Sequence, residues 1–122
     1  MFEFNGTNLK SLGVIALNSN YLDRFKRNIE KISVPGRTGN LIINNNSYDN
    51  LELEIECFLE DRTDIDAKLT TIENYLLSAK DYSTLKFKNK IFSAFFIEIK
   101  EIKNIVKNAI TFKIVFTVRK GA

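Results

Sequence analysis

Apolar and polar residues alternate along two segments of the chain. In residues 51–60, LELEIECFLE, apolar residues take the odd positions and glutamates take the even ones, with Phe58 as the exception. In residues 110–119, ITFKIVFTVR, apolar residues take the even positions, and Thr, Lys or Arg take most of the odd ones. A period of two indicates a β-strand with one buried and one solvated face. We therefore predict that both segments are strands of an antiparallel sheet.

Other segments also have the composition of strands. Residues 91–102, IFSAFFIEIKEI, are apolar on both sides at first and amphipathic later. Their link to residues 110–119 is predicted to be a hairpin turned by Asn104 and Asn108. Near the N-terminus, FEF precedes an NG turn, LGVIAL indicates a second strand, and RNIEKISV indicates a third that ends at Pro35.

One segment changes to a helical period. Between residues 63 and 78, apolar residues recur at spacings of four, three and four, which places them on one stripe of a helix. The stripe consists of Ile65, Leu69, Ile72 and Leu76, widened by Tyr75 and Leu77. Thr63 and Asp66 resemble a capping box, and the acidic residues of the first turn suit the helix dipole. We predict a core-packing helix over residues 63–78.

The order of elements is strands, one helix, then strands, without the alternation of a βαβ repeat. This order predicts a mainly β (α+β) fold, an antiparallel β-sandwich with one α-helix at about 63–78 and an extended loop or hairpin at about 35–50. A length of 122 residues suits one domain. We expect residues 1–122 to form a single domain, with no second domain in this chain.

Composition argues against several classes of function. The chain has no histidine, which excludes a Ser-His-Asp triad, a Cys-His dyad and most zinc sites. Its one cysteine, Cys57, cannot form an internal disulfide and lies in a strand pattern typical of a small buried side chain. No spacing of Asp and Glu resembles a calcium loop, and no segment resembles a membrane span or a signal peptide. The sequence argues against an enzyme, and we expect no cofactor, no metal and no membrane partner.

The net charge of +3 is unevenly distributed. Residues 1–50 carry a net charge of +2, residues 51–79 carry −6 and residues 80–122 carry +7. The lysines of the last part mostly alternate with apolar residues along strands, so they are expected on the solvated faces of a sheet. A nucleic-acid surface would instead gather its cations with exposed aromatic residues on one face. The pattern therefore argues against nucleic-acid binding.

The segment VPGRTGNL, residues 34–41, holds the only proline and two of the five glycines. Pro35 ends the preceding strand, and Gly36 and Gly39 permit positive φ on both sides of Arg37, so the chain can reverse tightly. GRTG matches the GXXG loop of some RNA-binding domains, but that loop joins two helices, whereas strand patterns flank this one. A phosphate cradle would need a G-K-[ST] sequence and a following helix. A tight turn explains the glycines but leaves Arg37 unexplained.

Several of these segments together resemble a known family. The chain contains, in order, FEFNG, IEKISVPGRTGNL, Tyr48, a single predicted helix, LKFKNKIFSAFF and a final FKIVF. Through these segments it resembles a phage distal tail protein. The resemblance spans nearly the whole chain, and its most specific part is the VPGR-x-G-x-L block at residues 34–41.

The resemblance implies a structural role without catalysis. Members of the family form a hexameric ring at the end of the tail tube, with tube protein on one side and the tail-associated lysin or tip protein on the other. DNA would pass the ring only as cargo. The protein would be part of the virion of a phage, or of a phage-derived tail, assembled in the host cytoplasm. Many relatives continue into a second domain, so the chain would be either a short, ring-only member or the N-terminal half of a longer protein.

In this family the ring-forming domain extends a hairpin toward a neighbouring subunit. By position, that segment would begin at residues 35–50. The implied subunit-interface residues are Pro35, Gly36, Arg37, Gly39, Leu41 and Tyr48. We expect Arg37 to make a bidentate contact with a carboxylate, or with backbone carbonyls, of the adjoining subunit.

A row of glutamates and a row of lysines are candidates for complementary surfaces of a ring interface. The rows are Glu52, Glu54 and Glu56, and Lys86, Lys88 and Lys90. The two rows could instead pair across strands inside one subunit, or the glutamates could line a channel and repel passing DNA. The alternative function is a stand-alone β-sandwich adaptor that binds peptide or carbohydrate as a monomer.

Overall fold

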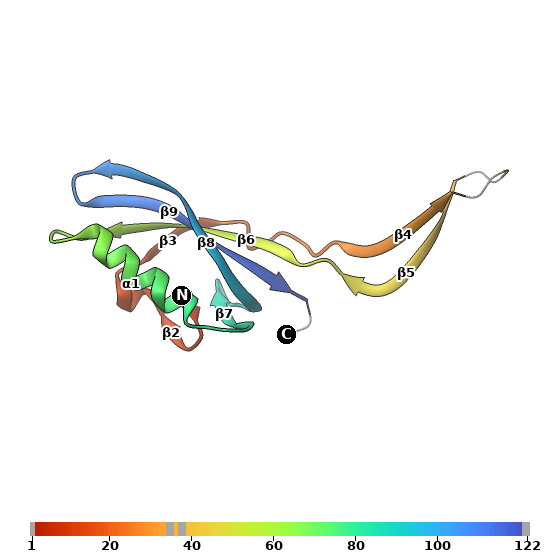
Figure 1. The fold of residues 1–122 in the computed structure, drawn as a ribbon, viewed down its shortest axis with the longest axis horizontal. Helices are drawn as coiled ribbons and strands as arrows, with labels where there is room; N and C mark the ends of the chain where they lie inside the picture. The colour runs from red at the N-terminus through yellow and green to blue at the C-terminus, as the bar shows by residue number, and fades with distance from the viewer. Residues whose placement is uncertain (1, 34–35, 37–38, 121–122) are drawn as a thin grey trace.

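The computed structural model describes residues 2–33, 36 and 39–120, and its strands and single α-helix confirm the predicted mainly β fold (Figure 1). The elements follow in the order β1 (Phe2–Phe4), β2 (Thr7–Asn8), the 3-10 helix η1 (Leu9–Leu12), β3 (Ile15–Ser19), β4 (Arg27–Ser33), β5 (Asn40–Tyr48), β6 (Leu51–Glu60), α1 (Ile65–Leu77), β7 (Ser83–Phe87), β8 (Lys90–Val106) and β9 (Ala109–Arg119). Strands β4 and β5 pair with each other, and the other strands form one sheet in the order β2-β1-β7-β8-β9-β6-β3. We call this sheet, together with α1, the body.

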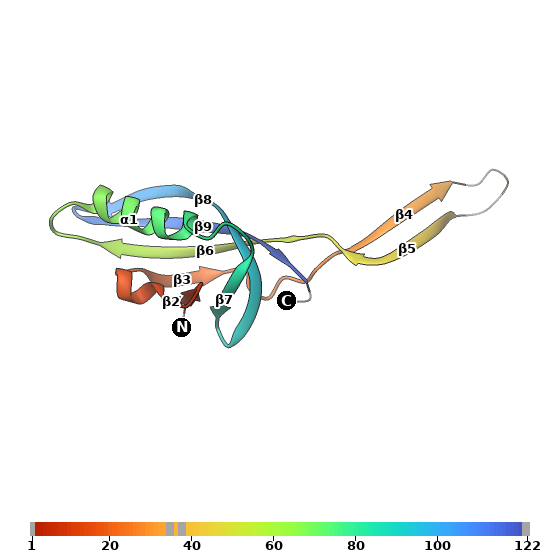
Figure 2. The same ribbon diagram turned by 60° about the horizontal axis from the view of Figure 1, so that its bottom comes forward.

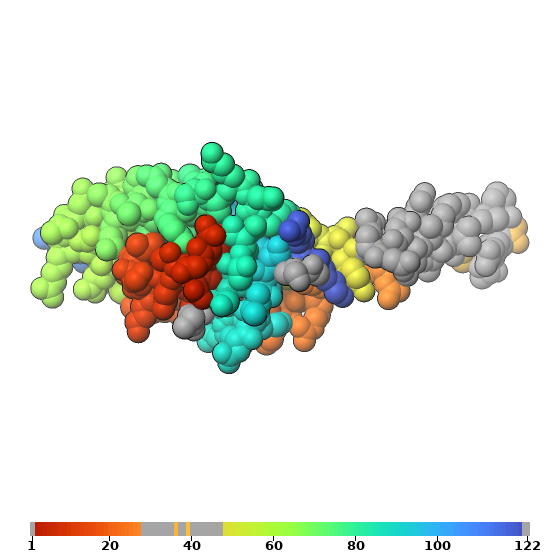
Figure 3. Space-filling model, turned by 90° about the horizontal axis from the view of Figure 1, so that it is seen from below, coloured from red at the N-terminus to blue at the C-terminus, as the bar shows by residue number. Residues whose placement is uncertain are grey.

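The seven-stranded sheet curls over on itself. Strands β1 and β9 are three places apart in the sheet, which in a flat sheet is about 14 Å at the usual strand spacing. The ring of Phe4 on β1 nevertheless lies 5.1 Å from the ring of Phe116 on β9, centroid to centroid. The two layers expected of a sandwich are therefore two parts of one continuous curled sheet, and the core lies between them. On the face shown in Figure 3, the N-terminal segment lies beside the β7 region, in agreement with the pairing of β1 with β7.

The two alternating segments form neighbouring strands at the centre of this core. In the register of β6 and β9, Leu53 lies opposite Phe116, and Ile55 lies opposite Ile114. All four side chains are fully buried. The prediction from the period of two is thus confirmed for both segments.

The helix is confirmed, with a different cap. Helix α1 begins after Asp64, whose carboxylate accepts a hydrogen bond from the backbone N–H of Ala67 at 3.1 Å. Thr63 does not cap it, because its hydroxyl and N–H both donate to the Asp61 carboxylate. Ile72 and Leu76 are buried in the core, whereas Leu77, which we expected to widen the apolar stripe, is exposed. Among the described residues, no helix has the length and apolarity needed to cross a membrane.

Two strand boundaries differ from the prediction. The first residue of the expected LGVIAL strand, Leu12, is instead the last residue of the 3-10 helix η1, which begins where the Asn8 side chain accepts a hydrogen bond from the Lys10 N–H. Gly13 ends η1 with a φ of 89°, so β3 begins only at Ile15. Strand β8 continues through Asn104 to Val106, and the turn to β9 is made at Asn108, with a φ of 65°. Asn104 is therefore a strand residue and not a turn residue.

The extended hairpin is confirmed and is longer than predicted. Its strands β4 and β5 pair from Arg27 opposite Tyr48 to Ser33 opposite Asn40. We call residues 27–48 the arm, which projects from the body (Figures 1 and 2). The N–H of Asp49 donates to the carbonyl of Lys26 at 2.8 Å and closes its base. The arm therefore continues the antiparallel pair of β3 and β6 beyond a break in the ladder.

Candidate functional site

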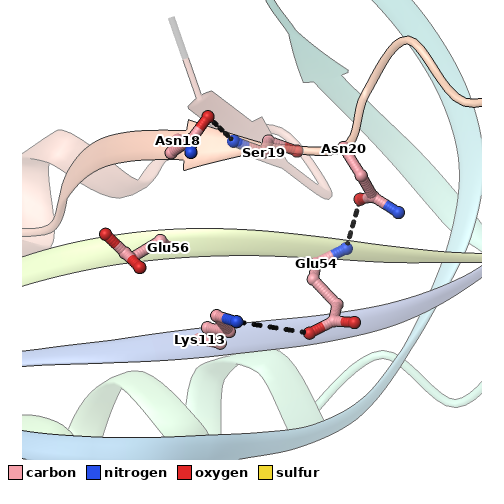
Figure 4. A pocket seen from close by; sticks show the side chains of 6 residues that line it. All are labelled: Asn18, Ser19, Asn20, Glu54, Glu56 and Lys113. Atoms are coloured by element: carbon pink, nitrogen blue, oxygen red, sulfur yellow. Dashed lines mark hydrogen bonds and ion pairs between the residues drawn. The ribbon is translucent and has the colours of Figure 1, made fainter.

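A shallow polar pocket lies where β3, the last strand of the sheet, meets β6 and β9 (Figure 4). Its lining residues are Asn18, Ser19, Asn20, Glu54, Glu56 and Lys113. Because β6 buries its odd positions, the glutamates at its even positions lie on the outer face of the sheet. We call this pocket the β3 groove.

Asn20 joins β3 to β6 through its side chain. Its amide oxygen accepts a hydrogen bond from the N–H of Glu54 at 2.8 Å, and its amide nitrogen donates to the carbonyl of Glu52 at 2.9 Å. The side-chain amide thus takes the place of a peptide group of β3 in the pairing with β6, just where β3 ends. This contact positions the end of the groove nearest the arm, because the chain leaves for the arm after this residue.

A network of ion pairs covers the groove and the strands beside it. The Lys100 Nζ lies 3.3 Å from Glu54 and 3.8 Å from Glu52, and the Lys113 Nζ lies 2.7 Å from Glu101 and 3.9 Å from Glu54. The hydrogen bond to Glu54 raises the pKa of Lys100, and the one between Lys113 and Glu101 raises the pKa of Lys113 and lowers that of Glu101. These groups are therefore charged at neutral pH.

Two polar groups on the strands of the groove have no partner within the described part of the chain. Glu56 stands opposite Lys113 in the strand register, yet it forms no ion pair with any described residue. The Ser19 Oγ atom is buried and has no hydrogen-bond partner there. Ser19 stands opposite the buried Ile55 in the register, so its hydroxyl lies on the core side of β3, whereas Glu56 lies on the outer face and is open to an external partner.

The row of lysines lies elsewhere in the chain, around the β7–β8 turn. The Nζ of Lys86 lies 3.8 Å from Glu3, and the Nζ of Lys90 donates to the carbonyl of Tyr21 at 3.3 Å. Lys88 is an exposed turn residue. In the glutamate row, Glu52 and Glu54 pair with Lys100 and Lys113 and not with this row. A contact between the two rows across a subunit interface stays a prediction.

The candidate interface residues of the arm are only partly described. Gly36 and Gly39 have φ values of 77° and 83°, as the tight turn predicted, whereas Pro35 and Arg37 lie outside the described residues. Leu41 pairs with Ile32 in the ladder of the arm.

Tyr48 lies at the base of the arm and not at its tip. The Nζ of Lys120 stands 3.7 Å from the centroid of its ring. Hydrogen bonding with Lys120, and the charge of that lysine, lower the pKa of the Tyr48 hydroxyl. Tyr48 therefore connects the arm to the end of β9.

Sequence reasoning missed the β3 side of the groove. The segment NSN at residues 18–20 carried a signal, since three small polar residues follow an apolar run, but such clusters usually mark loops. The ion-pair partners of the glutamates were also missed, because Lys100 and Glu54 are brought together by strand pairing. Among the described residues, no group of three or more Asp, Glu, His or Cys could hold a metal ion.

Comparison with protein families shows to which family the chain belongs. Residues 1–118 match the family described as the phage tail protein N-terminal domain. The chain belongs to this family. It is therefore a phage tail domain, as the resemblance in the sequence indicated, and a component of the virion. No curated protein matches it.

The phage tail domain also has the fold of a phage protein of known structure. The crystal structure of the Dit protein (gp 19.1) of SPP1, described as a paradigm of the hub adsorption apparatus in phages that infect Gram-positive bacteria, superposes with a TM-score of 0.76. The sequences are 14% identical, and the match covers 98% of this chain and 49% of that one. The chain thus spans about half the length of the SPP1 protein, and the likeness shows the fold.

Proposed function

We propose that the chain is a structural protein that forms an oligomeric ring at the distal end of a phage tail tube, with residues 1–122 as a single ring-forming domain. The ring joins the tube protein to tip or baseplate proteins, such as a tail-associated lysin, and DNA passes through it as cargo. No catalysis is involved. The family match and the hub role of the SPP1 Dit protein support this position in the tail.

The proposal rests mainly on the arm, which projects from the body without a partner in the described structure. A two-stranded hairpin is marginally stable by itself in water, and stable sheets have three or more strands or pack against another layer. The arm pairs only with itself in the described structure and projects from the body (Figure 2). A neighbouring subunit would supply the missing partner. A contact between the arm of one copy and the body of the next is head-to-tail, which is the kind of interface that closes into a ring.

Solution mass across a concentration series tests the proposal. Light scattering or native mass spectrometry is expected to show a closed oligomer, and a hexamer would have roughly six times the chain mass of 14.1 kDa. Assembly on a fragment of the tail tube serves as a second condition, because some rings form only on a template. A monomer in both conditions would contradict the proposal and favour the adaptor that binds peptide or carbohydrate.

Replacement of Arg37 by alanine is expected to weaken ring assembly and to leave the monomer folded. The reason is the loss of the proposed bidentate contact with the adjoining subunit. Native mass spectrometry measures the assembled fraction, and circular dichroism checks the fold. Arg62→Ala, at the loop before α1, is the matched control. Unchanged rings in the Arg37 variant would make this arginine a turn residue only.

A further inference from the structure

The proposed function leaves open where the arm of one subunit binds on the next. The sequence of the arm is basic: residues 27–48 contain Arg27, Lys31 and Arg37 against Glu30 alone, a net charge of +2. Its binding surface on a neighbour is therefore expected to be acidic. The arm projects from its own body, so that body does not cover it (Figures 1 and 2).

The β3 groove and its ion-pair network have the complementary charge. The carboxylates of this surface are Glu52, Glu54, Glu56 and Glu101, and its cations are Lys100 and Lys113. The surface therefore carries a net charge of −2. Glu56 is the carboxylate left without an ion-pair partner in the described structure, and Asn18 lies opposite it on β3.

The groove borders a free strand edge. Strand β3 is the last strand of the sheet and pairs only with β6, with a register shift between Ala16 and Asn18. Its apolar residues Ile15 and Leu17 are each 50% exposed. An edge strand with unpaired backbone groups and exposed apolar side chains is a template for an added strand.

We propose that the arm of a second copy lies along β3, over the β3 groove, with a cation of the arm at Glu56. This inference rests on the proposed ring and identifies its interface. The second copy supplies a pairing strand for β3 and a charge for Glu56. In return, the groove gives the arm the additional layer that a two-stranded hairpin lacks.

Another exposed apolar surface among the described residues is a poorer site for the arm. It lies at the end of the β8–β9 hairpin, where Ile102, Ile105 and Val106 are all more than half exposed. The neighbouring cations Lys103 and Lys107 are exposed as well. Like charges across an interface are unfavourable, so a basic arm is expected to avoid this end.

Charge reversal at Glu56 tests the binding surface. Glu56→Lys is expected to raise the concentration needed for half-assembly by about tenfold or more, because it places like charges together. Glu60→Lys is the matched control: it reverses an exposed glutamate of the same strand outside the groove. Rings that form equally well in both variants would overturn this binding surface and leave the ring itself intact. A wild-type chain that never assembles, alone or on a tube, would overturn the ring and this inference together.

Cross-linking locates the arm directly. A chain with Asn18→Cys in the groove and Asn45→Cys in the arm is expected to give covalent oligomers with a bismaleimide, and Cys57 does not interfere because it is buried. The comparison chain carries Ile105→Cys at the β8–β9 end with the same arm cysteine. Cross-links between subunits in the Asn18 chain support the inference. Cross-links confined to the Ile105 chain overturn it.

Discussion

Replacement of Phe116 by alanine is expected to lower the free energy of unfolding by about 3–5 kcal/mol, the usual cost of removing a large aromatic side chain from a core. Phe116 is fully buried, and its ring lies 5.1 Å from that of Phe4, 6.4 Å from that of Phe2 and 6.1 Å from that of Phe96. These rings hold together the two parts of the curled sheet. Since small domains are stable by about 5–15 kcal/mol in total, the loss is a large fraction. Urea denaturation followed by circular dichroism measures it.

The matched control for this substitution is Ile91→Ala on β8. Ile91 is a large apolar residue of the same sheet but is 66% exposed, so its replacement is expected to change stability by less than about 0.5 kcal/mol. Equal losses in the two variants would show that Phe116 does not join the two parts of the sheet.

Cys57 is expected to react with iodoacetamide about 1000-fold more slowly in the native chain than in the unfolded one at pH 8. Burial raises the pKa of its thiol from 9.0 to about 12, with a smaller contribution from the charge of Glu56. The thiolate is the reactive form, so a higher pKa leaves a much smaller reactive fraction at this pH. The rate is measured by mass spectrometry with and without urea.

The slower reaction of Cys57 in the native chain can also be tested across a range of pH. Between pH 7 and 9 the native rate is expected to stay far below the unfolded rate, because the native thiol stays protonated throughout this range. Phe116→Ala supplies a positive control, since a destabilised core opens more often and admits the reagent. A native rate close to that of the unfolded chain would show that β6 does not bury Cys57.

Much of the local structure was determined by sequence alone. The period of two in residues 51–60 and 110–119 predicted β6 and β9 and their buried faces, and the period near 3.6 predicted α1. These patterns are local: each depends on which face of one element meets the core. The glycines of the arm turn were predicted for the same reason, because positive φ at Gly36 and Gly39 is a property of single residues.

The tertiary structure alone decided how distant residues meet. Whether Glu54 pairs with Lys100 or with the lysines near residue 88 depends on strand order and on the register shifts of β8, which no local pattern encodes. The Asn-rich half of the arm has the composition of a loop, and its strand exists through pairing with β4. In the same way, the sequence around Asn20 is typical of a polar loop, and only the structure shows that its side chain bonds to the backbone of β6. Sequence determined which face of each element is buried. Long-range strand pairing decided the groove, because it brings together residues from β3, β6 and β9.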